Sequence, residues 1–119
     1  MKFHSLSRRE RMTSAPEFKR ALDNGTTYHG KKLNLRVAQN DHGFSRIGIC
    51  LRREYFKLAT QRNKMRRYLK EIFRLNKNIL KKGYDILAMP KRGCDNLTFA
   101  ELSDEFTQII KKANILNTA

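Results

Sequence analysis

The spacing of the apolar residues changes from two to about 3.6 near residue 56, and this change restricts the chain to folds that combine strands with helices. Residues 33–37 and 47–51 alternate apolar and polar side chains, which is typical of strands with one buried face. A turn cluster at 40–43 lies between them, so the two strands are predicted to form an antiparallel hairpin. Residues 56–82 carry two parallel stripes, which indicate one long amphipathic helix. The apolar stripe consists of Leu58, Met65, Leu69, Ile72 and Ile79, and the basic stripe of Arg66, Lys70, Arg74, Lys77 and Lys81.

Further elements are predicted on both sides of this helix. A capped helix spans 14–25, and a short strand is expected near 26–30. The apolar run 84–89 predicts a strand that Pro90 stops, and a capping box at 98–101 begins a last amphipathic helix. The predicted order is therefore α-β-β-β-α-β-α, an α+β fold in which helices cover one sheet.

The length of 119 residues suits one compact domain, 1–119, with an ordered core at about 3–113. No apolar run approaches the ~20 residues that cross a bilayer, and the first residues show no secretory apolar region. We therefore expect a cytoplasmic protein without a membrane partner. Cys50 and Cys94 are far apart and have no neighbouring ligands, which argues against a disulfide framework or a zinc module.

The net charge of +15 implies a polyanionic partner, because self-repulsion gives a small domain no structural benefit. The charge is concentrated in residues 52–82, which hold 12 basic and 2 acidic groups. Residues 83–119 hold 4 basic and 5 acidic groups. Residues 1–36 hold 9 basic and 3 acidic groups. Nucleic acid is the favoured partner, and an anionic membrane surface or an acidic protein are the alternatives.

The stretch 58–71 is predicted to form a rod with an apolar face on one side and several cations on the other. A helix rises ~1.5 Å per residue, so Arg62, Arg66 and Lys70 lie about 6 Å apart along its axis. This spacing is close to that of successive phosphates on a nucleic-acid strand. The alternative is a solvated face that serves solubility, but such faces mix charges of both signs, and Glu71 is the single acidic residue of this stretch.

The order Arg62-Asn63-Lys64-x-x-Arg67 inside a basic helix resembles the RNR motif of the bacterial ribonuclease P protein subunit. The resemblance covers roughly residues 3–112 in unbroken order. It also includes Phe3, Arg8–Met12, Glu17-Phe18, Gly25, Phe44–Ile49, Glu71-x-Phe73-Arg74 and Gly83–Ile86.

The resemblance implies an α–β sandwich in which the basic helix forms an unusual left-handed crossover. It also implies a subunit of an endoribonuclease that acts as a ribonucleoprotein. Its partners would be ribonuclease P RNA and precursor tRNA, whose 5′ leader is removed, and no protein partner is required. The RNA would supply the catalytic groups and would hold most of the Mg²⁺.

By the same resemblance, seven residues face the catalytic RNA and two face the leader. The first group is Arg53, Arg62, Asn63, Lys64, Arg66, Arg67 and Lys70, and the second is Phe18 and Arg36, in a cleft between the N-terminal helix and the sheet. Lys64 departs from the family's usual Arg, which keeps the charge but loses the planar fork. Glu54 stands where the family commonly has a Lys, so only Arg53 is carried over from that loop.

Several assignments have alternatives. Phe18 suits a core position as well as a platform on which bases stack, and Arg36 either reaches a leader phosphate or faces solvent. His4, His29 and His42 lack a carboxylate or second ligand at a suitable spacing, so we expect no catalytic and no metal-binding residue in this chain. A small basic ribosomal protein that binds rRNA is the alternative function, and an architectural DNA binder is a third.

Overall fold

The computed structural model describes residues 10–12, 15–40 and 42–115, and its elements follow the predicted order. They are α1 (Ala15–Asn24), β1 (Thr26–His29), β2 (Leu33–Gln39), β3 (Arg46–Ile49), α2 (Ala59–Asn76), β4 (Tyr84–Pro90), the short 3₁₀ helix η2 (Cys94–Asn96) and α3 (Phe99–Ala113). The predicted fold class, α+β with the order α-β-β-β-α-β-α, is confirmed. The predicted cap residue Ser14 lies outside the described residues.

The four strands form one sheet in the order β1-β2-β4-β3, so the predicted hairpin of β2 with β3 is wrong. Strand β4 lies between them, antiparallel to β2 and parallel to β3. Its residues Asp85 to Ala88 are all buried, which suits a central strand covered on both faces. Helix α2 connects β3 to the parallel β4, as such a crossover requires. The left-handed sense of this crossover remains a prediction from the family resemblance.

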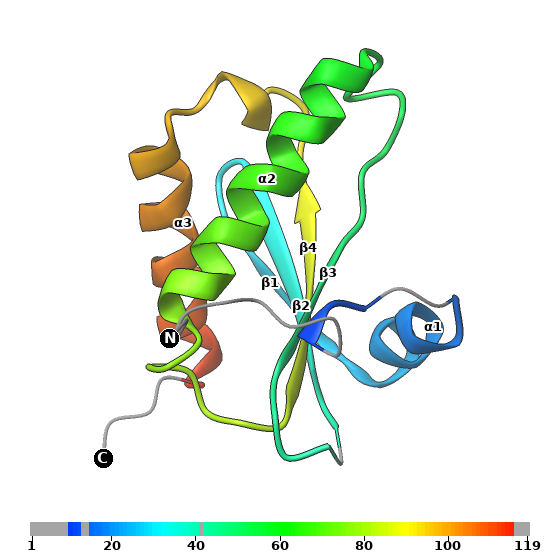
Figure 1. The fold of residues 1–119 in the computed structure, drawn as a ribbon, viewed down its shortest axis with the longest axis vertical. Coiled ribbons are helices and arrows are strands. Elements are labelled where there is room, and N and C mark those ends of the chain that lie inside the picture. Colours follow the sequence, from blue (N-terminus) through cyan, green and yellow to red (C-terminus); the bar gives the residue numbers. More distant parts are fainter. Residues whose placement is uncertain (1–9, 13–14, 41, 116–119) are drawn as a thin grey trace, which may run out of the picture.

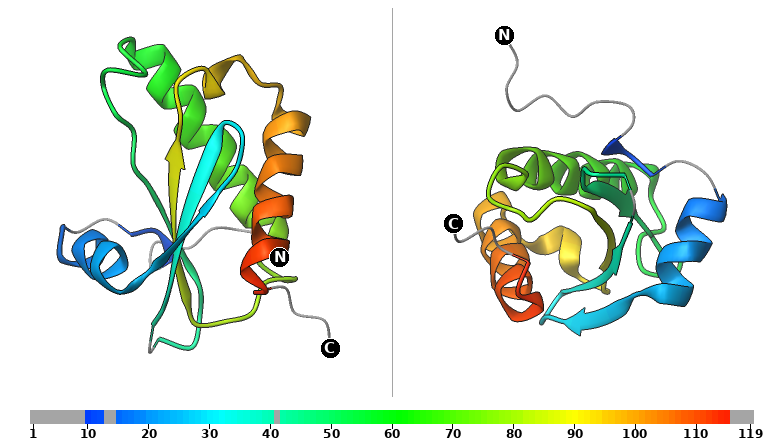
Figure 2. Two further views of the ribbon diagram at one scale, coloured as in Figure 1. Left: turned by 180° about the vertical axis from the view of Figure 1, so that it is seen from behind. Right: turned by 90° about the horizontal axis from the view of Figure 1, so that it is seen from below.

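Helices α2 and α3 cover one face of the sheet, and α1 packs on the other (Figure 1, Figure 2). Successive side chains along each strand point alternately to the two faces of the sheet. Leu35 and Ile86 belong to the core beneath α2 and α3. Gly48 lies beneath α1, where a Cβ would come within 2.9 Å of Phe18 and 3.2 Å of Leu87. The arrangement is an α–β sandwich.

Helix α2 is shorter than the stripe pattern predicts. Met65, Leu69 and Ile72 are fully buried, as expected, but Leu58 and Ile79 lie outside the helix and are 62% and 47% exposed. The side-chain amide of Asn76 donates a hydrogen bond to the Ile72 carbonyl at 2.7 Å, and the helix ends there. The predicted extension of the helix to residue 82 is therefore wrong.

The capping box of α3 is confirmed. The Glu101 amide donates to the Thr98 hydroxyl at 3.1 Å, and the Thr98 amide donates to the Glu101 carboxylate at 2.9 Å. Strand β4 includes Pro90 rather than stopping before it. Among the described residues, no helix combines the length and the apolar character needed to cross a membrane.

Candidate nucleic-acid interface

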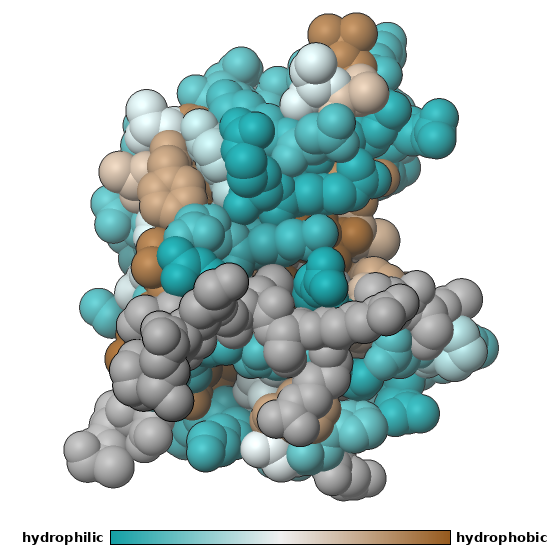
Figure 3. Space-filling view, in the orientation of Figure 1, coloured by the Kyte–Doolittle hydropathy of each residue, from teal (hydrophilic) through white to brown (hydrophobic). Residues whose placement is uncertain are grey.

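The outer face of α2 carries the basic stripe into solvent. Asn63, Arg66 and Arg67 are exposed, and Lys70 is half-buried one turn further along. The Arg66 guanidinium donates to the Asn63 side-chain oxygen at 3.3 Å, so neighbouring turns of the helix share one polar surface. Figure 3 shows that the side of the molecule presented by α2 is mainly hydrophilic.

Arg62 and Lys64, which belong to the same motif, are half-buried and bonded to the protein itself. Nη1 of Arg62 donates to the carbonyl of Phe56 at 2.8 Å and to that of Lys57 at 3.0 Å. Nζ of Lys64 donates to the Asp95 carbonyl at 2.7 Å. The structure therefore divides the predicted RNA-facing residues of α2 into two sets. Asn63, Arg66, Arg67 and Lys70 form an outer set, and Arg62 and Lys64 form an inner set.

The loop that leads into α2 places Arg53 in solvent, in a turn that also contains Glu54. The Glu54 carboxylate forms an ion pair with the Arg52 side chain. The acidic residue that departs from the family pattern therefore partners a neighbouring cation, and Arg53 is the exposed cation of this turn.

A cleft of about 160 Å³ opens beside β3, and helices α1 and α2 line it from opposite sides. Phe18 of α1 lines it together with Gly48 of β3. Arg66 and Lys70 of α2 line the same cleft, as does Arg11, whose backbone bridges to β3. The structure therefore brings the aromatic residue predicted for the leader next to two cations predicted for the catalytic RNA.

Arg36 does not line this cleft. Its Nε donates to the carbonyls of Ala21 at 3.2 Å and Leu22 at 2.7 Å, and its Nη1 donates to the Thr27 hydroxyl at 2.7 Å. A cation at the C-terminal carbonyls of a helix complements the helix dipole. Arg36 thus holds the end of α1 against β2 and the start of β1.

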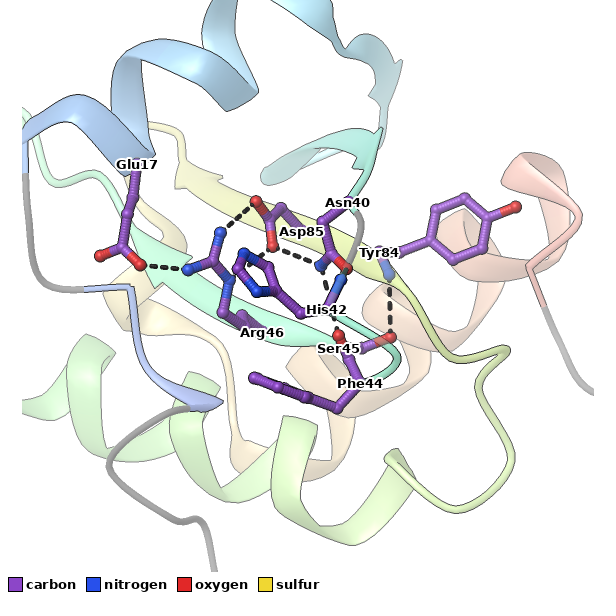
Figure 4. A network of polar contacts seen from close by, with 8 residues as sticks. All are labelled: Glu17, Asn40, His42, Phe44, Ser45, Arg46, Tyr84 and Asp85. Carbon is purple, nitrogen blue, oxygen red and sulfur yellow. Dashed lines mark hydrogen bonds and ion pairs between the residues drawn. The ribbon is translucent and has the colours of Figure 1, made fainter.

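A buried polar network attaches the other end of α1 to the sheet (Figure 4). Arg46 of β3 donates to Asp85 of β4 from Nε at 2.8 Å and from Nη2 at 2.7 Å, and its Nη1 pairs with Glu17 of α1. Asn40 donates to the same Asp85 carboxylate at 2.7 Å. The hydrogen bonds from Arg46 to Asp85 raise the pKa of Arg46 against the opposing effect of burial, so this buried side chain keeps its charge.

Among the described residues, no group of three or more His, Cys, Asp or Glu side chains is close enough to hold a metal ion. Cys94 is buried in the core, and this burial raises the pKa of its thiol to about 12, which disfavours the thiolate that a nucleophile requires. Cys50 is exposed and unpaired.

The sequence profile of the family described as Ribonuclease P matches residues 6–114 of this chain. The chain belongs to the ribonuclease P protein family. The ribonuclease P protein components of Thermotoga maritima and Pseudomonas putida are 33% and 31% identical to it, over 105 and 108 residues. These alignments cover 88% and 90% of this chain, and 82% and 80% of the two relatives.

Solved structures of the ribonuclease P family share the fold. The ribonuclease P protein of Thermotoga maritima superposes with a TM-score of 0.78 at 28% identity, covering 87% of this chain and 96% of that one. The ribonuclease P protein of Staphylococcus aureus superposes with a TM-score of 0.81 at 20% identity, covering 91% of this chain and 98% of that one.

The chain has a second basic cleft that sequence analysis missed, on the part of the sheet that α1 leaves open. It encloses about 530 Å³ and is lined by Lys31, Lys32, Asn34, Cys50, Arg52, Tyr55, Met89, Pro90, Lys91 and Arg92. The Tyr55 ring has the Arg52 guanidinium 5.0 Å from its centroid and the Arg92 guanidinium at 4.8 Å. These cations come from segments that are far apart in the chain, so only their basic character was visible in the sequence.

Proposed function

We propose that this chain is the protein subunit of a ribonuclease P ribonucleoprotein. In this proposal it binds the catalytic RNA and the single-stranded 5′ leader of precursor tRNA, in the cytoplasm, and needs no protein partner. The RNA supplies the catalytic groups and holds most of the Mg²⁺ that leader removal requires. The observation that carries the proposal is the cleft in which Phe18 faces Arg66 and Lys70, because it joins a platform for bases to cations for phosphates.

The surface for the catalytic RNA is the outer face of α2 and the turn before it. Arg66, Arg67 and Lys70 supply cations at helical spacing, and Asn63 adds an amide that can both donate and accept. Arg53 extends this surface beyond the start of the helix. Four cations along one strand or groove of RNA would make the affinity fall steeply with salt.

The surface for the leader begins at Phe18 and continues over the open part of the sheet to Tyr55. Phe18 and Tyr55 are both half-buried and each lines a cleft, where an aromatic ring can stack a base, worth ~1–3 kcal/mol, whatever the base is. Arg52 and Arg92, whose guanidinium groups both lie near the Tyr55 ring, provide charges for the backbone phosphates. We assign Arg36 to this surface indirectly, because it holds α1, which carries Phe18.

Reconstitution tests the proposal. The full chain is mixed with the cognate ribonuclease P RNA, and cleavage of precursor tRNA is followed at a Mg²⁺ concentration where the RNA alone is slow. We expect the chain to restore cleavage and the chain alone to cut nothing. Cleavage by the RNA-free chain, or binding to rRNA fragments with equal affinity and no gain in cleavage, would contradict the proposal.

Two variants separate the surfaces. Arg53→Ala with Arg67→Ala, neither of which lines the Phe18 cleft, should weaken binding to ribonuclease P RNA while preference for precursor over mature tRNA is retained. Phe18→Ala should reduce that preference by roughly fivefold, since a lost stacking contact is worth ~1 kcal/mol or more. Equal loss of both properties in both variants would show that the two surfaces are one.

A further inference from the structure

We propose that Arg62 and Lys64 are positioning residues, which hold the start of α2 against the preceding loop and η2, and that they do not contact RNA phosphates. The phosphate contacts of this part of α2 then come from Arg67 of the motif and its neighbour Arg66. This inference rests on the proposed RNA-binding function and divides its residues between two tasks. It differs from the expectation that all the cations of the motif face the RNA.

Arg62 is bonded to the loop that precedes its own helix. A single nitrogen, Nη1, donates to two carbonyls, those of Phe56 and Lys57. Phe56 is fully buried in the core, so these bonds join the first turn of α2 to a rigid part of the protein. Because two carbonyls converge on the guanidinium, releasing it toward a phosphate would leave both without this donor.

Lys64 is bonded to the opposite side, to η2. Its Nζ donates to the Asp95 carbonyl at 2.7 Å and lies 5.4 Å from the centroid of the Tyr68 ring. Gln61 reinforces the same junction, because its amide nitrogen donates to the Asp95 carboxylate at 3.0 Å while its oxygen accepts from the Leu58 amide at 2.9 Å. The junction thus joins the loop, the first turn of α2 and η2 by side chains of residues 61–64.

Arg66 and Arg67 make no comparable contacts with the part of the chain that the structure describes. Both side chains are exposed, and Arg66 donates only to Asn63 among the described residues. The Arg67 guanidinium lies 5.7 Å from the centroid of the Tyr68 ring, and no described residue accepts a hydrogen bond from it. Their guanidinium groups therefore remain available for the bidentate contacts that Arg makes with phosphates.

The position of the junction explains why it would matter for RNA binding. The loop held by Arg62 follows the turn that carries Arg53 and Tyr55. η2 follows Arg92, which stacks on the Tyr55 ring and donates to the Glu54 carbonyl at 3.3 Å. A loose junction would therefore misplace cations of both proposed surfaces without removing any of them.

The salt dependence of binding distinguishes positioning from phosphate contact. Affinity for the cognate ribonuclease P RNA is measured at constant Mg²⁺ over a series of monovalent salt concentrations, for full-length variants. Arg66→Ala and Arg67→Ala should each reduce the slope of log Kd against log salt by about 0.7–0.9, as expected for one lost phosphate contact. Arg62→Ala should weaken binding by roughly 3- to 10-fold at every salt concentration, from lost hydrogen bonds to a charged donor, with the slope unchanged.

Neutral and acidic members of the junction provide matched variants. Gln61→Ala removes no charge, yet it should reproduce the salt-independent weakening of Arg62→Ala. Asp95→Ala removes a negative charge, so electrostatics alone would leave RNA binding unchanged or tighter, whereas a loosened junction should weaken it. Arg62→Lys should restore part of the affinity, because an ammonium can donate to both carbonyls.

Circular dichroism and the thermal midpoint check that each variant is folded, and only folded variants are compared. A slope reduced by Arg62→Ala as much as by Arg66→Ala would overturn the inference, as would unchanged or tighter binding by Asp95→Ala. Failure of the proposed function has a different signature, because the unmodified chain would then show no preference for ribonuclease P RNA over other structured RNA at matched salt.

Discussion

At the scale of single residues, the strongest constraint is the ion network beneath α1. Arg46 and Asp85 are 4% and 1% exposed, and together they bring a full positive and a full negative charge into the interior. Such a pair is tolerated only where the geometry is good and further hydrogen bonds satisfy the remaining atoms. Asn40 and Glu17 provide those additional partners here.

Breaking this pair should be costly. Arg46→Met leaves the Asp85 carboxylate buried without its cation, so the free energy of unfolding should fall by about 3–5 kcal/mol. Urea denaturation measures the change. Lys19→Ala, which breaks an ion pair whose side chains are 75% and 58% exposed, is the control and should change stability little. Equal effects of the two substitutions would contradict the role of burial.

The α3 capping box makes a contribution to folding stability that depends on pH. Hydrogen bonds from the Thr98 backbone and side chain lower the pKa of Glu101 below its ordinary 4.5. A lowered pKa in the folded state means that the ionised carboxylate stabilises the fold. This contribution is complete above about pH 4.5 and is lost as the pH falls through the lowered value.

Amide hydrogen exchange measures this effect. Protection of the Thr98 amide should decrease as the pH is lowered through the Glu101 transition, after correction for intrinsic exchange. Glu101→Gln keeps an oxygen that accepts from Thr98 and should make the corrected protection independent of Glu101 ionisation. Glu71, whose pKa is lowered by Arg74, titrates in the same direction in both proteins, so the difference between them isolates Glu101. The same pH dependence in both would contradict the assignment.

At the scale of elements, α1 is held on the sheet at both ends and closely approaches β3 between them. Arg36 holds its C-terminal carbonyls, and Glu17 reaches the buried network from its first turn. Between these attachments Phe18 packs directly over Gly48, where no side chain intervenes. The shape of the cleft is therefore set by the distance between a helix and an edge strand.

Adding a methyl group at that contact should change the cleft. A Cβ at residue 48 would lie 2.9 Å from Phe18 and 3.1 Å from Met12, so Gly48→Ala should displace the Phe18 ring. We expect preference for precursor over mature tRNA to fall by roughly fivefold, through ~1 kcal/mol of lost stacking, with affinity for the ribonuclease P RNA retained.

Gly43→Ala is the matched control for this prediction. Gly43 has a φ of +75°, so an alanine there should destabilise the fold by about 1–2 kcal/mol. Apart from its chain neighbours, no described residue has an atom within 4 Å of the added Cβ. Preference for precursor tRNA should be unchanged in this variant. A similar loss in both variants would attribute the effect to stability and not to the cleft.

At the scale of the whole molecule, the acidic side chains of α3 lie apart from the basic face of α2. Glu101, Asp104 and Glu105 of α3 line a separate cleft of about 650 Å³ facing the β1–β2 hairpin. The same cleft is also lined by Lys31, Lys32 and Lys112, so charges of both signs meet there. No residue of α2 lines that cleft. Exposed charges further apart than about 8 Å are largely screened at physiological ionic strength, so the two regions should act separately.

Asp104→Lys tests whether position or total charge decides affinity. This substitution raises the net charge from +15 to +17 but adds the charge beside the α3 cleft. At 0.15 M salt we expect affinity for ribonuclease P RNA to change by less than about twofold, because the added charge lies at a cleft that no α2 residue lines and exposed charges are strongly screened at this salt concentration. Arg66→Ala, which changes the charge by only one unit, should have the larger effect. If Asp104→Lys raised the affinity for ribonuclease P RNA by a larger factor than Arg66→Ala lowered it, total charge and not position would decide the affinity.

Sequence patterns predicted helices and strands correctly where interactions between nearby residues determine them. The α3 capping box, the alternating strands and the buried face of α2 all depend on residues within one or two turns of each other. The hairpin of β2 with β3 was predicted wrongly, because short alternating runs do not specify their neighbours and β4, 35 residues further on, takes the intervening place. The C-terminal end of α2 was predicted wrongly, because the side chain of Asn76 bonds back to the Ile72 carbonyl and the helix ends before Ile79.

The sequence by itself determined the order of the elements, the concentration of charge in residues 52–82 and the match to the ribonuclease P family. These depend on periodicity and motif, which are properties of neighbouring residues. Only the tertiary structure decided that Phe18 shares a cleft with Arg66, that Arg36 holds the end of α1 and that Arg62 and Lys64 bond to the protein. A side chain's partners depend on which distant segments packing brings within hydrogen-bonding distance, and no local pattern encodes that distance.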